Sequence, residues 1–181
     1  YDTELFGHWW HEGPDWLAEV LRLLPEAQIR TTTLARAIQD GQVAGPALLP
    51  AGSWGSGKDW RVWDGAQVAD LVGVNEELQA RALALVRREL SRAGAMGQRQ
   101  PALDEVMRQL LLTLSSDWAF MVTKDSAADY ARRRAGEHAR RTRELLDGID
   151  AGIDQARTAS ASGTDRCFPH LDARLLTGLD H

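Results

Sequence analysis

The sequence predicts a mainly α-helical protein in two regions, and three observations support this. Apolar side chains recur at three- and four-residue steps through most of residues 65–153, which is typical of amphipathic helices. Six of the seven tryptophans lie in residues 1–64, where acidic residues outnumber basic ones nine to five. Apolar residues make up 44% of the 181 residues and charged residues 26%, as in globular proteins. We therefore expect residues 1–64 to end an α/β unit and residues 65–181 to be all helical.

Two short helices are expected in the first region. One covers residues 14–24, because its opening Gly-Pro-Asp places proline in the first turn. The second covers residues 34–39, where the Thr33 hydroxyl can accept a hydrogen bond from a backbone amide at the helix start. Residues 41–64 show neither helical nor strand periodicity. A loop of that length in a compact domain is commonly functional.

Three longer helices are expected in the second region, packed as an antiparallel bundle. The first covers residues 64–92, with Gly73 favouring a break inside it. The second covers residues 101–115 and opens at a proline. The third begins after Asp125 or Ser126, either of which can cap it, and continues to about residue 153. Of the tail, the TASASGTD segment is expected to be mobile and the last residues to dock on the bundle.

Composition and charge exclude several classes of protein. No stretch has the roughly 18 apolar residues of a membrane-spanning helix, and the opening YDTELFGHWW lacks the basic segment of a signal peptide. The single cysteine, Cys167, excludes a disulfide framework and favours a reducing compartment, so we expect a cytoplasmic protein. The net charge of −5 argues against a partner that is a nucleic acid.

Carboxylates, imidazoles and indoles crowd residues 1–13. An acid beside bulky indoles loses solvation, which raises its pKa towards the range useful to a general acid. A hydrophobic turn with exposed acids is the alternative. His8 and His11 have a spacing that a metal pair could use, but no further ligands follow, so no metal site is expected.

The motif DTELFGHWW, followed by a helix that opens with Gly-Pro, closely resembles the fourth conserved region of glycoside hydrolase family 57. Residues 52–63, GSWGSGKDWRVW, resemble the fifth region. Residues 110–120, with Asp129-Tyr130-Ala131 and Glu137-His138, resemble the C-terminal helical domain of the family's α-1,4-glucan branching enzymes. The tail Arg-Cys-Phe-Pro resembles their last residues, so the resemblance covers nearly the whole chain.

The resemblance implies a larger enzyme. Residues 1–64 would hold the last strand and helix elements of a (β/α)7 barrel, and residues 65–181 an all-α C-terminal domain. The family's first three regions, with an H-Q-P motif and the catalytic glutamate nucleophile, have no match here. A retaining glycosidase needs two carboxyl groups about 5–5.5 Å apart, so we expect this chain to be inactive alone.

The resemblance also implies roles for individual residues. Asp2 matches the general acid/base, and Glu4 and His8 match positions that orient or contact substrate. Trp54 and Trp63 match indoles on the acceptor side, where an indole face can cover a sugar ring.

Asp117 resembles a family acid that reaches towards the active-site cleft, while capping the turn after helix 101–115 is an equal alternative. Five other aromatic or histidine positions are expected to have structural roles or stay open. Trp9, Trp10 and Trp16 are expected to pack, and Trp60 stays open between packing and sugar contact. His138 lies on an apolar stripe and is expected to be a hydrogen-bonded core histidine.

The third helix carries a basic run, Arg132–Arg134 with Arg140, Arg141 and Arg143, which suggests phosphate or nucleic-acid binding at first sight. Its arginines, however, lie four residues from acids, as in a salt-bridged solvated face. The expected pairs are Asp129–Arg133, Glu137–Arg141, Arg140–Glu144 and Arg143–Asp147.

The resemblance therefore implies the C-terminal portion of a 1,4-α-glucan branching enzyme that makes α-1,6 branches, and it implies no cofactor. Its expected partners are an α-1,4-glucan, as donor and acceptor, and the N-terminal catalytic part of the same enzyme. Neither a membrane nor a nucleic acid is expected. An α-amylase or a 4-α-glucanotransferase of the same family is the alternative. A non-catalytic helical carbohydrate-binding or interaction module is the alternative of another class.

Overall fold

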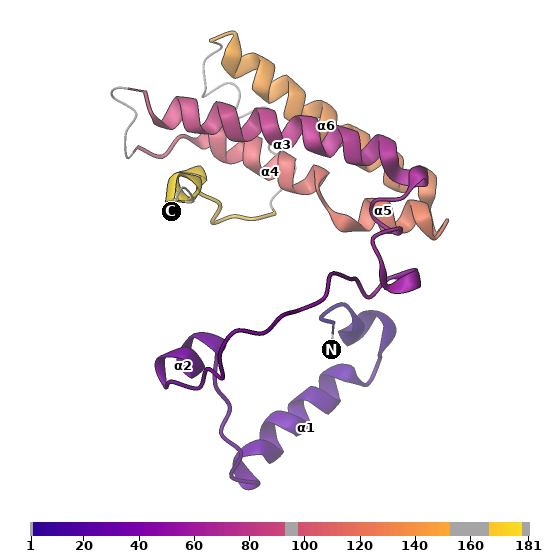
Figure 1. The fold of residues 1–181 in the computed structure, drawn as a ribbon, viewed down its shortest axis with the longest axis vertical. Helices are drawn as coiled ribbons and strands as arrows, with labels where there is room; N and C mark the ends of the chain where they lie inside the picture. The colour runs from indigo at the N-terminus through magenta and orange to yellow at the C-terminus, as the bar shows by residue number, and fades with distance from the viewer. Residues whose placement is uncertain (1, 93–97, 153–166, 179–181) are drawn as a thin grey trace. The chain divides into compact units, whose positions relative to one another are not determined.

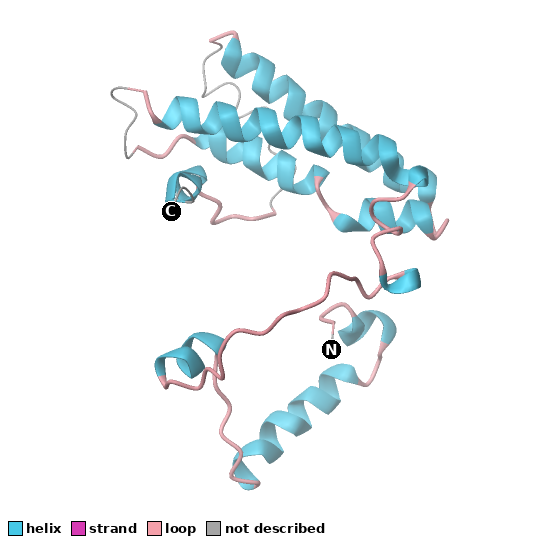
Figure 2. Ribbon diagram, viewed as in Figure 1, coloured by secondary structure: helices cyan, strands magenta, loops and turns pink. Residues whose placement is uncertain are grey.

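The chain forms two compact units, Tyr1–Pro50 and Ala51–His181. The computed structural model describes residues 2–92, 98–152 and 167–178. Every regular element within these ranges is helical, and no strand is formed among them (Figure 2). The mainly α prediction is confirmed, whereas the predicted barrel strand is not found in the described residues. The domain boundary predicted at residue 64 stays a prediction, and residues 51–64 group with the second unit.

The first unit contains one irregular helical turn and two helices. The turn, η1, covers Leu5–Trp9, α1 covers Gly13–Glu26 and α2 covers Leu34–Gln39 (Figure 1). Both predicted helices are confirmed. The Thr33 hydroxyl accepts a hydrogen bond from the Arg36 backbone amide at 3.2 Å, as its position before α2 predicts.

Within the first unit, little apolar surface is covered by the unit itself. Gly13 is the one buried residue of α1. Leu34 is 87% exposed and Leu48 is fully exposed. Much of the apolar side-chain surface of this unit is therefore left open to solvent. The other exposed large apolar residues of this unit are Trp9, Trp16, Leu17, Leu21, Leu23, Ile29, Ile38, Val43 and Leu49.

The second unit is a helical bundle, in which α3, α4 and α6 lie side by side (Figure 1). It begins with two short turns and ends with a third. Its elements are η2 (Ser56–Lys58), η3 (Ala66–Val68), α3 (Ala69–Leu90), α4 (Pro101–Thr113), α5 (Ser116–Thr123), α6 (Ala128–Asp150) and η4 (Ala173–Gly178).

The core of the second unit lies between these three long helices. Leu78 from α3, Leu103 and Leu110 from α4, and Leu146 from α6 are each at most 1% exposed. Burying a leucine side chain contributes about 1.5–3 kcal/mol, so these residues account for much of the stability of the unit. The apolar periodicity that predicted the helices therefore also identifies their buried faces.

The structure corrects three local expectations. Helix α3 runs unbroken through Gly73, which is exposed and where an added Cβ would meet no neighbouring atom within 4 Å. Helix α6 is capped by neither Asp125 nor Ser126, because Ala127, at φ 85°, occupies the cap position. The segment Ser116–Thr123 forms a separate helix, α5, that the sequence analysis did not predict.

The basic run of α6 forms more contacts between helices than expected. Glu137–Arg141 is paired at 2.7 Å, and Arg140–Glu144 at 2.5 Å, as predicted. Arg143 instead binds Glu77 of α3 at 2.8 Å, and this hydrogen-bonded guanidinium holds the pKa of Glu77 below its usual range. Of the other members of the predicted pairs, Asp147 binds Arg81 of α3, and Arg133 lies over the ring of Tyr130. These arginines therefore tie α6 to α3 as well as facing solvent.

His138 lies in the core, 1% exposed, as predicted. Its Nδ1 is 2.9 Å from Gln109 Oε1, and its Nε2 is 3.2 Å from the Arg134 guanidinium. The Gln109 amide nitrogen in turn donates to Glu105 at 3.0 Å. The Gln109 oxygen therefore accepts from Nδ1–H, and Arg134 donates to an unprotonated Nε2. The contacts fit a neutral imidazole that joins α6 to α4.

The last described residues dock on α4, as expected. Arg99 donates to the Leu171 carbonyl at 2.5 Å, and Asp104 accepts a hydrogen bond from the Ala173 amide at 2.8 Å. Ala173 is 3% exposed. The TASASGTD segment lies outside the described residues. No helix in the described ranges is long and apolar enough to cross a membrane.

Candidate functional site

The tryptophan-rich loop of residues 51–64 presents a group of aromatic side chains on the second unit. The Trp54 and Trp63 rings meet edge to face with centroids 5.3 Å apart. Trp54 also lies 5.5 Å from the ring of Phe120 on α5. Trp54 nevertheless remains 68% exposed, and Trp60 is 53% exposed. The structure therefore brings the two predicted indoles together and leaves a large part of Trp54 open.

Helix α5 holds this loop by polar contacts as well. The Thr123 hydroxyl donates to the Val62 carbonyl at 2.7 Å and accepts from the Gln67 amide at 2.9 Å. Lys124 Nζ donates to the Ser56 hydroxyl at 2.6 Å. Val62 itself is fully buried. The loop thus has a fixed position on α5 although it lacks regular secondary structure.

Gly55 allows the loop backbone to pass directly over an indole. A Cβ at this position would lie 2.8 Å from Trp63 Cζ3 and 3.0 Å from a methyl carbon of Val62. Its amide donates to the Ser53 hydroxyl at 3.1 Å, and that hydroxyl donates to the Asp59 carbonyl at 2.5 Å. The turn therefore fixes the Trp63 ring under the backbone and requires a residue without a side chain.

A forked ion pair sets the shape of the turn that follows. Both carboxylate oxygens of Asp59 accept hydrogen bonds from the Arg61 guanidinium, at 2.6–2.9 Å. Asp59 Oδ1 also accepts from the Arg61 backbone amide at 3.0 Å. These bonds, the side-chain ones foremost, lower the pKa of Asp59 to about 2. Asp59 therefore acts as an ionised turn former.

Asp117 lies in the first turn of α5 and is exposed. The Ser115 hydroxyl donates to its Oδ2 at 3.3 Å. A carboxylate at the N-terminal end of a helix interacts favourably with the helix dipole, so local structure accounts for an acid here. The predicted substrate role stays a prediction.

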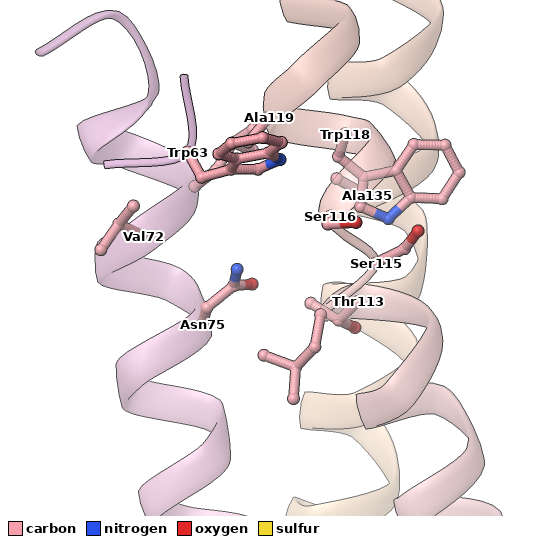
Figure 3. A pocket seen from close by; sticks show the side chains of 11 residues that line it. Trp63, Val72, Asn75, Thr113, Ser115, Ser116, Trp118, Ala119 and Ala135 are labelled. Carbon is pink, nitrogen blue, oxygen red and sulfur yellow. The ribbon is translucent and has the colours of Figure 1, made fainter. Parts of the chain in front are cut away.

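A hollow of about 240 Å³ lies beside the tryptophan pair, between α3, the start of α5 and α6 (Figure 3). Figure 3 shows Asn75 of α3 directed into the space and the indole nitrogen of Trp63 on the side facing Trp118. The hydroxyls of Ser115 and Ser116 lie on the opposite wall from Asn75. The apolar part of the lining consists of Leu71, Val72, Leu114, Ala119 and Ala135.

Trp118 is fixed from two sides. Its Nε1–H donates to the Leu112 carbonyl at 2.8 Å. Its ring stacks on His138 with centroids 6.4 Å apart and an interplanar angle of 22°. Since His138 is itself bonded to Gln109 and Arg134, this wall of the hollow rests on the polar core of the bundle.

The amino-terminal motif has its own aromatic cluster in the first unit. The ring centroid of Trp10 lies 5.6 Å from that of Phe6 and 5.2 Å from that of Trp16. A Cβ at Gly13 would lie 2.9 Å from Phe6 Cδ1, so glycine allows α1 to start against these rings. Trp10 and Trp16 therefore pack, as expected, whereas Trp9 is 74% exposed.

Asp2 and Glu4 are exposed at the start of this cluster. The Asp2 carbonyl accepts a hydrogen bond from the Leu5 amide at 3.1 Å. Gly7, at φ 82°, makes the sharp turn within η1. The side chain of His8 lies outside the described residues. Their predicted catalytic and substrate roles remain predictions, and these three residues belong to a different unit from the two indoles and Asp117.

In the described part of the chain, no three His, Cys, Asp or Glu side chains are grouped so as to hold a metal ion. Sequence reasoning missed Asn75, Trp118 and Phe120. For Asn75 a signal existed, because it falls on the apolar stripe of α3, four residues after Leu71 and three before Leu78. An amide on an otherwise apolar stripe indicates a polar contact.

A comparison with protein families matches residues 75–176 to the family described as "1,4-alpha-glucan branching enzyme, C-terminal". A probable 1,4-alpha-glucan branching enzyme of Mycobacterium tuberculosis is 51% identical over 182 residues, which is 97% of this chain and 35% of the relative. A 1,4-alpha-glucan branching enzyme of Thermococcus kodakarensis is 36% identical over 150 residues, 82% of this chain and 22% of the relative. The chain thus spans about a third or less of these relatives.

Solved structures give the same similarity. A GH57 branching enzyme from Thermococcus kodakaraensis, in complex with glucose and additives, has a TM-score of 0.69 at 32% identity, over 94% of this chain and 32% of the other. A GH57-type branching enzyme from Pyrococcus horikoshii has a TM-score of 0.70 at 29% identity, over 97% and 34%. The α-amylase AmyC from Thermotoga maritima has a TM-score of 0.58 at 27% identity, over 97% and 32%.

Proposed function

The chain belongs to the family of 1,4-alpha-glucan branching enzyme C-terminal domains, and we propose that it works as the C-terminal part of such an enzyme, acting on an α-1,4-glucan. The observation that carries this proposal is the family match over residues 75–176. The 51% identity to a probable branching enzyme extends it to residues outside that match. The enzyme would cleave an α-1,4 link and transfer the released chain to an O6 hydroxyl.

In this proposal Asp2 is the general acid/base of a retaining mechanism. It would protonate the departing glycosidic oxygen and later deprotonate the acceptor hydroxyl. The nucleophile would come from the N-terminal catalytic part, because a retaining mechanism needs a second carboxyl group about 5–5.5 Å away. Glu4 and His8 would orient or contact the substrate beside Asp2.

Trp54 and Trp63 would carry the acceptor glucan. The exposed Trp54 face can cover the C–H face of a glucose ring, and Phe120 with Trp63 keeps that face in a fixed orientation. Covering the site also excludes water, which must lose to a sugar hydroxyl if transfer is to exceed hydrolysis. Asp117 would contribute a further polar contact with the glucan.

The uncovered apolar surface of the first unit supports an N-terminal catalytic part as a partner. Leu17, Leu21 and Ile29 are between 40% and 57% exposed, more than a self-contained unit of this size would leave uncovered. A barrel that packs on α1 would cover them. The cytoplasmic location expected from the single, exposed Cys167 stays a prediction.

The AmyC likeness supports a second candidate, an α-amylase that passes the cleaved chain to water. A 4-α-glucanotransferase using O4 is the third, and a non-catalytic carbohydrate-binding module remains the alternative of another class. Branching is favoured over these because the family match and the two relatives named above carry the description of a branching enzyme, one of them as probable.

Product analysis separates the candidates. Amylose would be incubated with the full-length polypeptide that carries this chain, and the linkages counted by proton NMR. Branching predicts new α-1,6 signals with little gain in reducing ends. Reducing ends without α-1,6 signals would instead indicate an amylase, redistributed α-1,4 chains a glucanotransferase, and an unchanged polymer a binding module.

A further inference from the structure

The sequence contains only two lysines, Lys58 and Lys124, and the side chains of both bind the tryptophan-rich loop. Lys58 Nζ donates to the Trp54 carbonyl at 3.3 Å, and Lys124 Nζ donates to the Ser56 hydroxyl at 2.6 Å. In the part of the chain that the structure describes, neither ammonium group is paired with a carboxylate, whereas most arginines are. The two lysines therefore serve the loop rather than ion pairs.

Lys124 joins the two surfaces that hold Trp54. On one side its ammonium group binds Ser56, two residues after Trp54 in the loop. On the other side the same group lies over the ring of Phe120, 6.0 Å from the ring centroid, and this ring is 5.5 Å from the Trp54 ring. A cation over an aromatic face is attracted to it. One cation thus fixes the loop and the ring beneath Trp54 relative to each other.

Backbone strain is concentrated on both sides of the contact between Lys124 and Ser56. Of the five non-glycine residues with positive φ in the described ranges, three lie here: Lys58 at 58°, Asp125 at 52° and Ala127 at 85°. Such conformations are unfavourable for a residue with a Cβ, and they persist where the surrounding structure requires them, often at functional positions. The strain therefore indicates that the placement of this lysine and of the loop matters.

We propose that Lys124 is a positioning residue, which holds the Trp54 ring so that its exposed face can receive the acceptor chain. The orientation of the ring rests on the contacts with Ser56 and Phe120, whereas its consequence for the reaction rests on the proposed function. If Trp54 covers the acceptor and excludes water, a ring that has lost this orientation should let water compete better with the sugar hydroxyl. Lys124 would thus influence the choice between transfer and hydrolysis through Trp54, without touching the reacting atoms.

A fluorinated tryptophan placed at position 54 of the full-length polypeptide reports the orientation of the ring without any glucan. Its ¹⁹F signal depends on the ring currents of Trp63 and Phe120, whose centroids lie 5.3 and 5.5 Å away. Lys124→Met removes the charge and the donor but keeps an unbranched side chain. We expect the signal to move by more than its line width in this variant. The melting temperature should not change, because Lys124 is exposed.

Three further variants separate this contact from a general effect of charge. Ser56→Ala removes the hydrogen-bond acceptor and should move the signal in the same direction, and combining it with Lys124→Met should add little, because both changes break one contact. Lys124→Arg keeps a cation and a donor and should restore the signal. Arg133→Met is the matched control, since it removes an exposed cation that lies 5.7 Å from the ring centroid of Tyr130 on α6, and it should leave the signal in place.

The consequence for the reaction is measured with amylose and the same full-length variants, as α-1,6 linkages formed per reducing end released. We expect Lys124→Met to lower this ratio about two- to fivefold, the effect of losing one exposed contact between a cation and a ring. Lys124→Arg should recover the ratio, and Arg133→Met should keep it.

An unmoved Trp54 signal in Lys124→Met would overturn the proposal, and so would an equal movement in Arg133→Met. Fully additive movements in Lys124→Met and Ser56→Ala would also overturn it, because they would show two unrelated effects. A moved signal with an unchanged product ratio would support Lys124 as the residue that orients Trp54 and reject the acceptor role of that ring. Absence of α-1,6 products from the unaltered polypeptide would reject the proposed function and leave the orientation of Trp54 by Lys124 standing.

Discussion

At the scale of single residues, Gly55 determines how the two indoles of the candidate site are held. Its backbone passes over the Trp63 ring so closely that a Cβ would lie 2.8 Å from a ring carbon. The same turn carries Trp54, whose ring meets Trp63 at 5.3 Å. A larger residue would therefore displace the ring, the backbone or both.

Gly55→Ala should lower the free energy of unfolding by about 1–3 kcal/mol, because the added methyl group overpacks the turn. Urea unfolding followed by tryptophan fluorescence would measure the change. Gly73→Ala is the matched control: Gly73 is exposed inside α3 and an added Cβ would meet nothing within 4 Å, so alanine should stabilise by about 0.5–1 kcal/mol. Equal effects at the two positions would contradict the close approach at Gly55.

The forked pair between Asp59 and Arg61 gives a pH-dependent prediction. The Arg61 hydrogen bonds lower the pKa of Asp59 from 3.8 to about 2. Because the folded pKa lies below the unfolded one, the pair stabilises the loop above about pH 4, and this contribution is lost as the pH falls towards 2. Carboxyl NMR should give a midpoint near 2 for Asp59, and Arg61→Met should return it towards 3.8. An unchanged midpoint in that variant would contradict the pairing.

Some residue-level features could be predicted and others could not. Thr33 as a helix cap and His138 as a bonded core residue follow from local pattern, because a hydroxyl before a helix and a polar group on an apolar stripe have few alternatives. The partner of Arg143 could not be predicted. Helix-surface spacing names an acid four residues away, whereas packing places Glu77 of α3 closer.

At the scale of elements, α5 is the helix that supports the candidate site. It spans Ser116–Thr123 and supplies Phe120 under Trp54. Its Thr123 hydroxyl ties the Val62 carbonyl to Gln67. The residues of this helix therefore position a loop whose own sequence encodes no regular structure.

Thr123→Val should loosen residues 51–64 while the bundle keeps its stability. Valine matches threonine in shape but cannot donate to the Val62 carbonyl or accept from Gln67, so both groups lose a partner. Hydrogen exchange should show backbone amides of the loop exchanging about 3- to 10-fold faster. The amides of α4 serve as the internal control. Unchanged exchange in the loop would show that aromatic packing alone holds it.

The long helices could be predicted because their apolar periodicity and their opening prolines are local signals. The separate helix α5 could not be predicted in the same way, since its eight residues give barely two turns of pattern. The position of the loop on α5 could not be predicted either, because the contact of Trp54 with Phe120 joins residues far apart in the chain. The predicted break at Gly73 was wrong, because the packed stripe of Leu71 and Leu78 outweighs the roughly 1 kcal/mol preference against a helical glycine.

At the scale of the whole molecule, the two units differ in how completely they bury apolar surface. The second unit has a core of residues such as Leu78 and Leu110, each at most 1% exposed. The first unit buries only Gly13 in α1 and exposes Leu21 by 57%. We therefore expect the two units to differ in stability when this chain stands alone.

Limited proteolysis with chymotrypsin checks this expectation. Cleavage of the 181-residue chain should begin within residues 1–50, where leucines and tryptophans are exposed, and should leave α3, α4 and α6 intact. The fragments would be identified by mass spectrometry. First cuts inside α4 would show that the second unit lacks the stable core described above.

The central claim is that this chain supplies the general acid/base of a branching enzyme, and the rate of α-1,6 bond formation from amylose tests it most directly. The measurement compares Asp2→Asn with Asp15→Asn, an exposed control on α1, in the full-length polypeptide. We predict that Asp2→Asn lowers the rate by at least about 100-fold with glucan binding retained, because the carboxyl group acts on the leaving oxygen. The control should keep its rate. A normal rate of α-1,6 bond formation in Asp2→Asn would contradict the account.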